Sequence, residues 1–247
     1  MKLSACPLLA VFVTVTAGCG PWVVPFPQPM VDPTNLPAVP DGSARVGVGL
    51  NPLSAEGTSG VSPLPGDLLG GTVRLDGGVG FQGWDLRAVV SPMASRVNHG
   101  SQYDLRVGRR LYGGPHVRLD VTDGAGATWF ASTYKDADYG YFAIAPHLGP
   151  RVSFKLGPRV EVPVVVEAGW SHVVPVYGLG AESRSAWWLG AAAAGVWHPG
   201  RGFSLGSGLD LVVSPDFPWT DLRLTFGASF EAPTKRRSVV EASHGGP

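Results

Sequence analysis

The chain has 247 residues, a length that one large all-β domain can occupy. Charged residues make up 15% of the sequence, well below the roughly 25% of ordinary soluble domains, so much of the surface is not composed for contact with water. The formal net charge is zero, which gives no electrostatic reason to expect nucleic acid as a partner. No apolar run approaches the length of about 18 residues that predicts a membrane-spanning helix.

The N-terminal residues 1–18 are typical of an export signal peptide, with Lys2 followed by an apolar stretch from Leu8 to Val15. The sequence Thr16-Ala17-Gly18-Cys19 resembles the lipobox of bacterial lipoproteins. That resemblance implies cleavage before Cys19 and attachment of diacylglycerol to its thiol. The mature chain would then hold Cys19 alone, because Cys6 leaves with the signal. An ordinary signal peptide with an incidental cysteine is the alternative.

Residues 19–43 are predicted to form a lipidated cysteine followed by a linker. Seven prolines fall at positions 21, 25, 27, 29, 33, 37 and 40. This composition favours an extended, polyproline-like chain that supplies little to a core. We expect a semi-rigid spacer between the anchored cysteine and a folded domain, with a ligand for an SH3-type module as the weaker alternative.

Residues 44–232 repeat one pattern, in which apolar and polar side chains alternate with a period of two. The longest example is the pair of runs from Tyr141 to Val174, separated by Gly157-Pro158-Arg159. Period-two alternation predicts β-strands with two unlike faces, and Gly-Pro between two runs predicts a turn. Ten such strands are expected, at 44–50, 73–81, 84–90, 103–111, 117–121, 141–156, 160–174, 186–197, 203–213 and 222–230.

Three of these strands carry features that could break them. Pro146, Pro150 and Pro163 each lack the N–H that a strand ladder needs, so the count of ten fails if the chain breaks at Pro146–Pro150. The segment 186–197 has small or apolar residues on both faces, and a short helix is an alternative there.

The connections between the strands are expected to alternate between short and long. Short turns follow the even-numbered strands, and longer loops occupy 51–70, 91–102, 123–140, 175–185 and 214–220. This asymmetry is typical of outer-membrane barrels, with tight periplasmic turns and larger external loops. It places both chain ends on the periplasmic side, where a lipidated Cys19 can reach the inner leaflet.

Alternation alone also fits a soluble β-sandwich or lipocalin-like barrel tethered by the linker, with its charged face toward water. The charged residues favour the membrane, because they are mainly Arg and Asp in near-equal number. Arginine is suited to buried ion pairs, since its planar fork binds carboxylates bidentately. We expect a lattice of pairs inside a narrow barrel, built from Arg74, Asp76, Asp85, Arg87, Asp104, Arg106, Arg118, Asp120 and Arg223.

Aromatic residues lie near the ends of the expected strands, as in the two aromatic girdles of membrane barrels. Three are expected at the turn side and three at the loop side: Trp84, Trp197 and Phe203, and Trp170, Trp187 and Trp188. The last strand, Thr225 to Ala232, resembles the terminal β-signal of outer-membrane proteins. Residues 233–247 follow it as a tail that is expected to be disordered.

A search for chemistry finds little. His99-Gly100-Ser101 in the second long loop loosely resembles the His-x-Ser of lipid A deacylase barrels, although Gln102 stands where that family has Asn. Ser171-His172 is no better, because adjacent strand residues point to opposite faces. Six scattered histidines do not suggest a metal site, and no motif for a cofactor is present.

The sequence therefore predicts an all-β fold, an antiparallel up-and-down transmembrane β-barrel of about ten strands. We expect an outer-membrane lipoprotein anchored at Cys19, with outer-membrane lipid as its surroundings and no enzymatic site. Its role would be structural or interactive, through the loops at 51–70, 123–140 and 175–185, with a protein partner that the sequence does not name. The alternatives are a lipid-modifying hydrolase that uses His99 and Ser101, or a tethered soluble binding protein.

Overall fold

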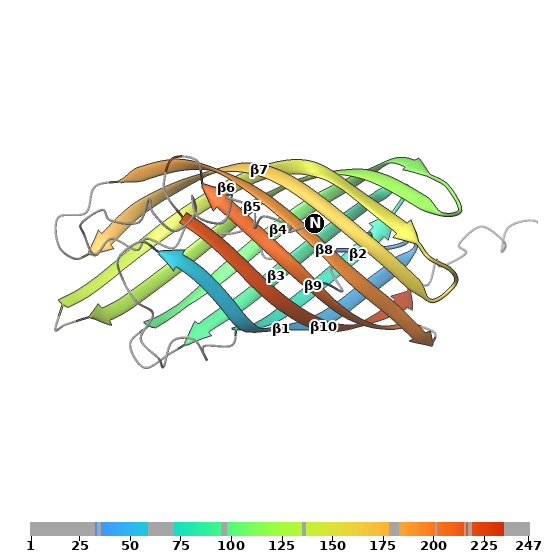
Figure 1. Cartoon of the computed structure of the whole chain (residues 1–247), viewed down its shortest axis with the longest axis horizontal. Helices are drawn as coiled ribbons and strands as arrows, with labels where there is room; N and C mark the ends of the chain where they lie inside the picture. Colours follow the sequence, from blue (N-terminus) through green and yellow to red (C-terminus); the bar gives the residue numbers. More distant parts are fainter. Residues whose placement is uncertain are drawn as a thin grey trace, which may run out of the picture.

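The computed structural model of the chain describes residues 33, 36–58, 72–94, 98–134, 137–177, 183–200, 202–214, 216 and 219–234. These residues form a closed barrel in which every strand pairs antiparallel with its neighbours, and β1 closes the barrel against β10 (Figure 1). No helix among the described residues is long and apolar enough to cross a membrane. The expected fold class, an antiparallel barrel of ten strands, is confirmed.

The strands follow one another around the barrel in chain order. They are β1 (Ser43–Thr58), β2 (Thr72–Phe81), β3 (Trp84–Ala94), β4 (Asn98–Gly113), β5 (Val117–Tyr134), β6 (Ala137–Lys155), β7 (Val160–Tyr177), β8 (Arg184–Gly200), β9 (Phe203–Ser214) and β10 (Trp219–Pro233).

One end of the barrel, which we call the turn end, holds the β2–β3, β4–β5, β6–β7 and β8–β9 connections. It also holds the start of β1 and the end of β10, where Thr234 N donates to Gly42 O over 2.7 Å. The β2–β3 connection is the dipeptide Gln82-Gly83, whose φ angles of 49° and 82° are those of a two-residue hairpin turn. We call the opposite end the far end.

The expected loops at the far end are largely wrong. Strand β5 extends to Tyr134 and β6 begins at Ala137, so nearly all of the expected loop at 123–140 is a paired hairpin. Most of the expected loop at 91–102 is likewise strand, because β3 ends at Ala94 and β4 begins at Asn98, and residues 95–97 lie outside the described part of the chain. Strands β7 and β8 take up both ends of 175–185. The loop expected at 51–70 is strand up to Thr58, and residues 59–71 lie outside the described part of the chain.

The three doubtful strands are all present, and Pro163 of β7 pairs with Ser153 of β6. β6 runs through Pro146 and Pro150, which pair with β5, while the pairing of β6 with β7 has gaps at these two positions. The missing N–H groups of proline therefore fall where the ladder is interrupted, and the strand does not break. The segment 186–197 lies within β8 and is a strand, not a helix.

The two faces of the barrel wall differ in polarity, and the charged face points inward. Arg74, Asp85 and Asp120 are buried in the lumen, whereas Leu105 and Leu209 on the outer wall are 65% and 55% exposed. Most positions of the described strands follow this arrangement, with large apolar side chains outward and charged, polar or small ones inward; Tyr141 and Val212 are among the inward exceptions. A soluble barrel has the opposite arrangement, because water would solvate the charged face.

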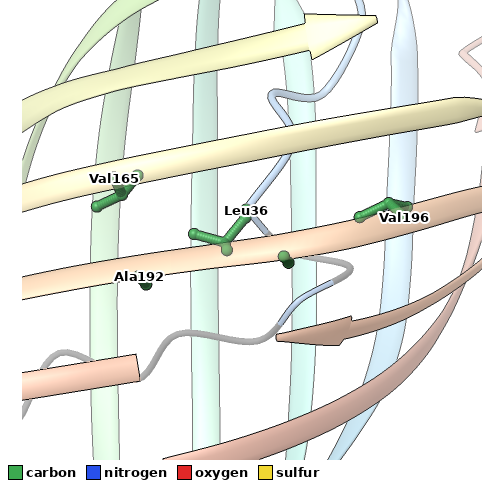
Figure 2. Packing of buried hydrophobic residues seen from close by; sticks show 5 residues of the cluster. Leu36, Val165, Ala192 and Val196 are labelled. Carbon is green, nitrogen blue, oxygen red and sulfur yellow. The ribbon is translucent and has the colours of Figure 1, made fainter. Parts of the chain in front are cut away.

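The lumen also contains the chain segment that precedes β1. From Gly42 at the turn end, residues 36–40 run back inside the barrel, and Leu36 packs against the apolar side chains of β7 and β8 (Figure 2). The contacts are with Val165, Ala192, Ala194 and Val196. The last part of the expected spacer is therefore inside the folded domain. Residues 19–32 of that spacer, the signal peptide and the tail from Lys235 lie outside the described residues.

Candidate functional site: the lumen and its turn-end vestibule

The lumen is crossed by a network of buried ion pairs centred on Arg151 of β6. Its guanidinium binds both oxygens of Asp85, at 3.1 and 3.3 Å, and Asp120 at 3.2 Å. Arg87 pairs with the same Asp85 at 2.9 Å, and Arg118 with Asp120 at 2.8 Å. The side chains of Arg151, Asp85 and Asp120 have no exposed area. Strands β3, β5 and β6 are thereby joined across the interior.

A second cluster lies farther from the turn end. Arg106 binds Asp104 and Glu167, each at 2.6 Å, and His147 Nε2 lies 3.6 Å from Asp104. The ring of Trp188 packs at 5.9 Å from that of His147. Full burial would by itself destabilise the Arg106 guanidinium, but its two carboxylate partners keep it charged.

All nine residues expected in the charge lattice lie on inward-facing positions, and eight of them are buried; Arg118 retains partial exposure. The lattice as expected lacked Arg151, Glu167 and His147, which make the contacts between distant strands. Their inward positions follow from the period-two pattern of β6 and β7, so the signal was present in the sequence.

The aromatic residues occupy both ends of the outer wall, with one exception. Trp197 and Phe203 are exposed at the turn end, and Arg109 lies 4.9 Å from the ring of Trp84. Trp170 and Trp187 are cross-strand partners on the outer face toward the far end. The expectation for Trp188 is wrong, because it follows Trp187 in β8 and points into the lumen, where it is 2% exposed. An added Cβ at Gly169 would collide with its ring.

The turn end holds a cavity of about 920 Å³, which we call the vestibule. Its lining includes Ala38, Pro40 and Asp41 of the N-terminal segment together with the turns around His116 and Pro158. Arg45 also lines it and fastens the segment, because its guanidinium donates to Pro37 O at 2.7 Å and to Glu231 at 2.8 Å.

Asp41 ties the same segment to the rim of the barrel. Its carboxylate accepts from Gly83 N at 2.8 Å and from Arg110 at 3.1 Å. The Gly83 N–H is the main cause that holds the pKa of Asp41 below its usual range; burial opposes this shift, and the Arg110 guanidinium lowers the pKa further.

Three consecutive strands project a serine, a histidine and a glutamate into the vestibule. Ser204 Oγ of β9 lies 2.8 Å from His198 Nδ1 of β8, and His198 Nε2 lies 3.8 Å from Glu161 of β7. All three residues line the cavity. Nothing in the sequence connects them, because they meet through strand register and not through a motif.

The residues first considered for catalysis are not brought together in a comparable way. His99 and Ser101 lie on β4 and not in a loop; they pair with Ala131 and Trp129 of β5. The side chain of His99 is outside the described set, and so is Cys19. His172 Nδ1 lies 2.8 Å from Ser185 Oγ on the outer wall and stacks on Trp170. Among the described residues, no group of three or more His, Cys, Asp or Glu side chains is arranged to hold a metal ion.

Comparison with known proteins gives similarity of fold only. No family model and no curated protein matches the sequence. Solved structures that are similar include the N-terminal β-barrel domain of Pseudomonas aeruginosa OprF (10% identity, 78% of this chain and 98% of that one, TM-score 0.39) and Ail of Yersinia pestis (12%, 78% and 99%, 0.36). The outer membrane protease OmpT of Escherichia coli is also similar (8%, 77% and 97%, 0.45). At these values neither a function nor a location transfers to this chain.

Proposed function

We propose that the chain is a bacterial outer-membrane β-barrel lipoprotein with a structural or interaction role. The observation that carries the proposal is the inverted polarity of the barrel wall: leucines and valines are exposed around the outside, while arginine–aspartate pairs are buried in the lumen. Lipid is the solvent that accepts such an outer surface, and a closed barrel leaves no unpaired strand edge in it.

The lumen supports a structural role over conduction. Arg151 and Arg106 each bridge strands across it, and Leu36 packs into it against β7 and β8. Ten strands enclose a narrow interior that side chains of this size occupy. We therefore assign no channel function.

The anchor and the partner surface follow from the sequence. The resemblance of residues 16–19 to a lipobox supports lipidation at Cys19, and the far end, with exposed Trp129, is the surface we assign to interaction. Incorporation of a palmitate analogue that disappears in Cys19→Ala would support the anchor. Equal incorporation in Cys19→Ala would contradict it.

The hydrolase alternative at His99 and Ser101 gains no support from the fold. Both residues belong to a regularly paired strand, and Ser101 alternates with Gln102 and Tyr103 as any strand residue does. We assign no enzymatic role to this pair, and Ser101→Ala should leave the lipid A mass profile unchanged.

The membrane location is tested by placing arginine on the outer wall at two depths. Leu209 lies in the middle of β9 and is 55% exposed, whereas Leu156 lies in the β6–β7 turn and is 67% exposed. In a bilayer, arginine at mid-depth costs about 2–4 kcal/mol and near the interface about 0–1 kcal/mol. Leu209→Arg should therefore lower heat-modifiable folding far more than Leu156→Arg. Equal tolerance of both variants, or release of the protein by carbonate, would contradict the proposal.

A further inference from the structure

A serine, a histidine and a carboxylate, each from a different strand, lie next to one another in the vestibule. Glu161, His198 and Ser204 occupy inward positions at the turn ends of β7, β8 and β9. A register shift between Trp197 and Gly200 places two residues of β8, His198 and Pro199, opposite the single residue Ser204 of β9. The backbone N–H of His198 donates to the backbone carbonyl of Arg159 at 2.8 Å, which fixes the start of the turn against β7.

The distances and the burial of these side chains suit a nucleophile, a base and an orienting group. Ser204 Oγ is 2.8 Å from His198 Nδ1, within hydrogen-bond reach of a base that can take its proton. Glu161 lies 3.8 Å from the other ring nitrogen, where its charge favours the imidazolium that forms. The Glu161 side chain is 15% exposed and that of His198 is 30% exposed, so the group is sheltered but open to the cavity.

We propose that Ser204 is an acyl-accepting nucleophile, with His198 as its general base and Glu161 as a positioning residue, for carboxylic esters that enter the vestibule from the turn end. Ser204 Oγ bonds to the ester carbonyl carbon as its proton passes to His198 Nδ1. The carbon–oxygen bond to the alcohol then breaks, and the same proton leaves with the alcohol. Water repeats the step on the acyl-serine, releases the carboxylic acid and restores the hydroxyl.

The remaining lining supports this chemistry. Basic side chains outnumber acidic ones in the lining, so negative charge that develops on the carbonyl oxygen forms near positive charge. They include Arg45, which pairs with Glu231, Arg118, which pairs with Asp120, and also Arg110 and Lys155. The cavity volume of about 920 Å³ is in the range of small-molecule sites. This inference departs from the expectation of a chain without an enzymatic site, and it goes beyond the proposed structural role.

The chain itself offers a matched control. Ser185 Oγ lies at the same 2.8 Å from a histidine Nδ1, that of His172, but this pair is on the outer wall. Among the described residues no carboxylate pairs with His172. A hydrogen bond to histidine is therefore common to both serines, whereas the carboxylate and the cavity belong to Ser204 alone.

The test is labelling of the full-length, refolded barrel with a fluorophosphonate, which bonds to an activated serine with loss of fluoride. We expect the modification on Ser204 by peptide mass spectrometry. It should be abolished in Ser204→Ala, slowed about 100-fold or more in His198→Gln, and unchanged in Ser185→Ala. A folded, heat-modifiable barrel that is not modified at Ser204, or that is modified equally at Ser185, would overturn the inference.

Hydrolysis of a p-nitrophenyl ester separates the role of Glu161 from mere support of the fold. Glu161→Gln should lower kcat and leave KM unchanged, and Glu161→Asp should recover part of the loss. A change in KM alone would contradict a positioning role. Labelling at Ser204 does not depend on carbonate extraction, so failure of the membrane proposal and failure of this inference are distinguishable.

Discussion

Replacement of Arg151 by methionine tests whether the buried ion pairs hold the barrel together. Arg151→Met preserves the volume and the aliphatic stem but leaves Asp85 and Asp120 without their shared partner. Both carboxylates have no exposed area and cannot be solvated by water. Removing one partner of a buried pair destabilises by about 3–5 kcal/mol.

The expected loss lies at the lower end of that range. Asp85 keeps Arg87 at 2.9 Å, and Asp120 keeps Arg118 at 2.8 Å, so neither carboxylate is left unpaired. We expect a decrease of about 3 kcal/mol in the free energy of unfolding. Urea titration of the barrel refolded in micelles, followed by tryptophan fluorescence and by heat-modifiable gel mobility, measures this difference.

Arg110→Met is the matched control for the same measurement. Arg110 pairs with Asp41 at 3.1 Å, but the two side chains are 32% and 41% exposed. An exposed pair contributes about 0–1 kcal/mol, so this variant should be nearly as stable as the parent chain. If the free energies of unfolding of Arg151→Met and Arg110→Met differ by less than about 1 kcal/mol, the buried network is not what stabilises the lumen.

Three further predictions concern the N-terminal segment and the glycines. A chain that begins at Pro40 lacks the residues that pack into the lumen beside β8, and it should show ion conductance in planar bilayers that the full chain lacks. Equal conductance would count against a role of residues 36–39 as a plug of the lumen. Gly149→Ala should destabilise by about 1–3 kcal/mol, because its Cβ would meet a backbone carbonyl of β7, whereas Gly195→Ala, with open space around it, should be neutral in the same urea titration. The lowered pKa of Asp41 means that its stabilising contacts are complete above the unfolded pKa and are lost as the pH falls through the folded one; the Gly83 amide resonance should follow that titration, and Asp41→Asn should abolish it.

The alternation of side chains was enough to predict the barrel and which way its walls face. The ten runs of period two correspond to ten strands. The charged residues that were assigned to one face from this alternation all lie on the lumen side. Parity also predicts that Trp187 and Trp188 cannot both face lipid, and the error at Trp188 came from treating them as a pair.

The ends of the strands were harder to predict, because the far ends of β5 and β6 are rich in glycine, alanine and aspartate. Such residues ordinarily mark turns. In the barrel they make room: an added Cβ at Gly124 would lie 2.6 Å from His147 Nε2 and 2.6 Å from Leu105 O. Small residues are needed there because side chains from other strands limit the space in the lumen. That limit cannot be predicted from the sequence of one strand.

The vestibule residues could not be found from the sequence for a related reason. Ser204 and His198 are six positions apart, but Glu161 is far from both, and the three meet only because β7, β8 and β9 end at the same level with a local shift in register. Sequence patterns give the face on which a residue lies; they do not give the height at which it meets residues of neighbouring strands.

The small residues of β8 and the proline-rich segment before β1 explain each other. The segment 186–197 was a doubtful strand because both of its faces carry small or apolar residues, and two of its inward residues, Ala192 and Ala194, pack in one cluster with Leu36. Strand β2 shows the same adaptation, since an added Cβ at Gly80 would collide with the carbonyls of Val39 and Pro40. A lumen lined by larger residues at these places could not admit the segment. Two parts of the sequence are therefore needed to place this segment in the lumen: the segment itself and the small residues of the wall that surround it.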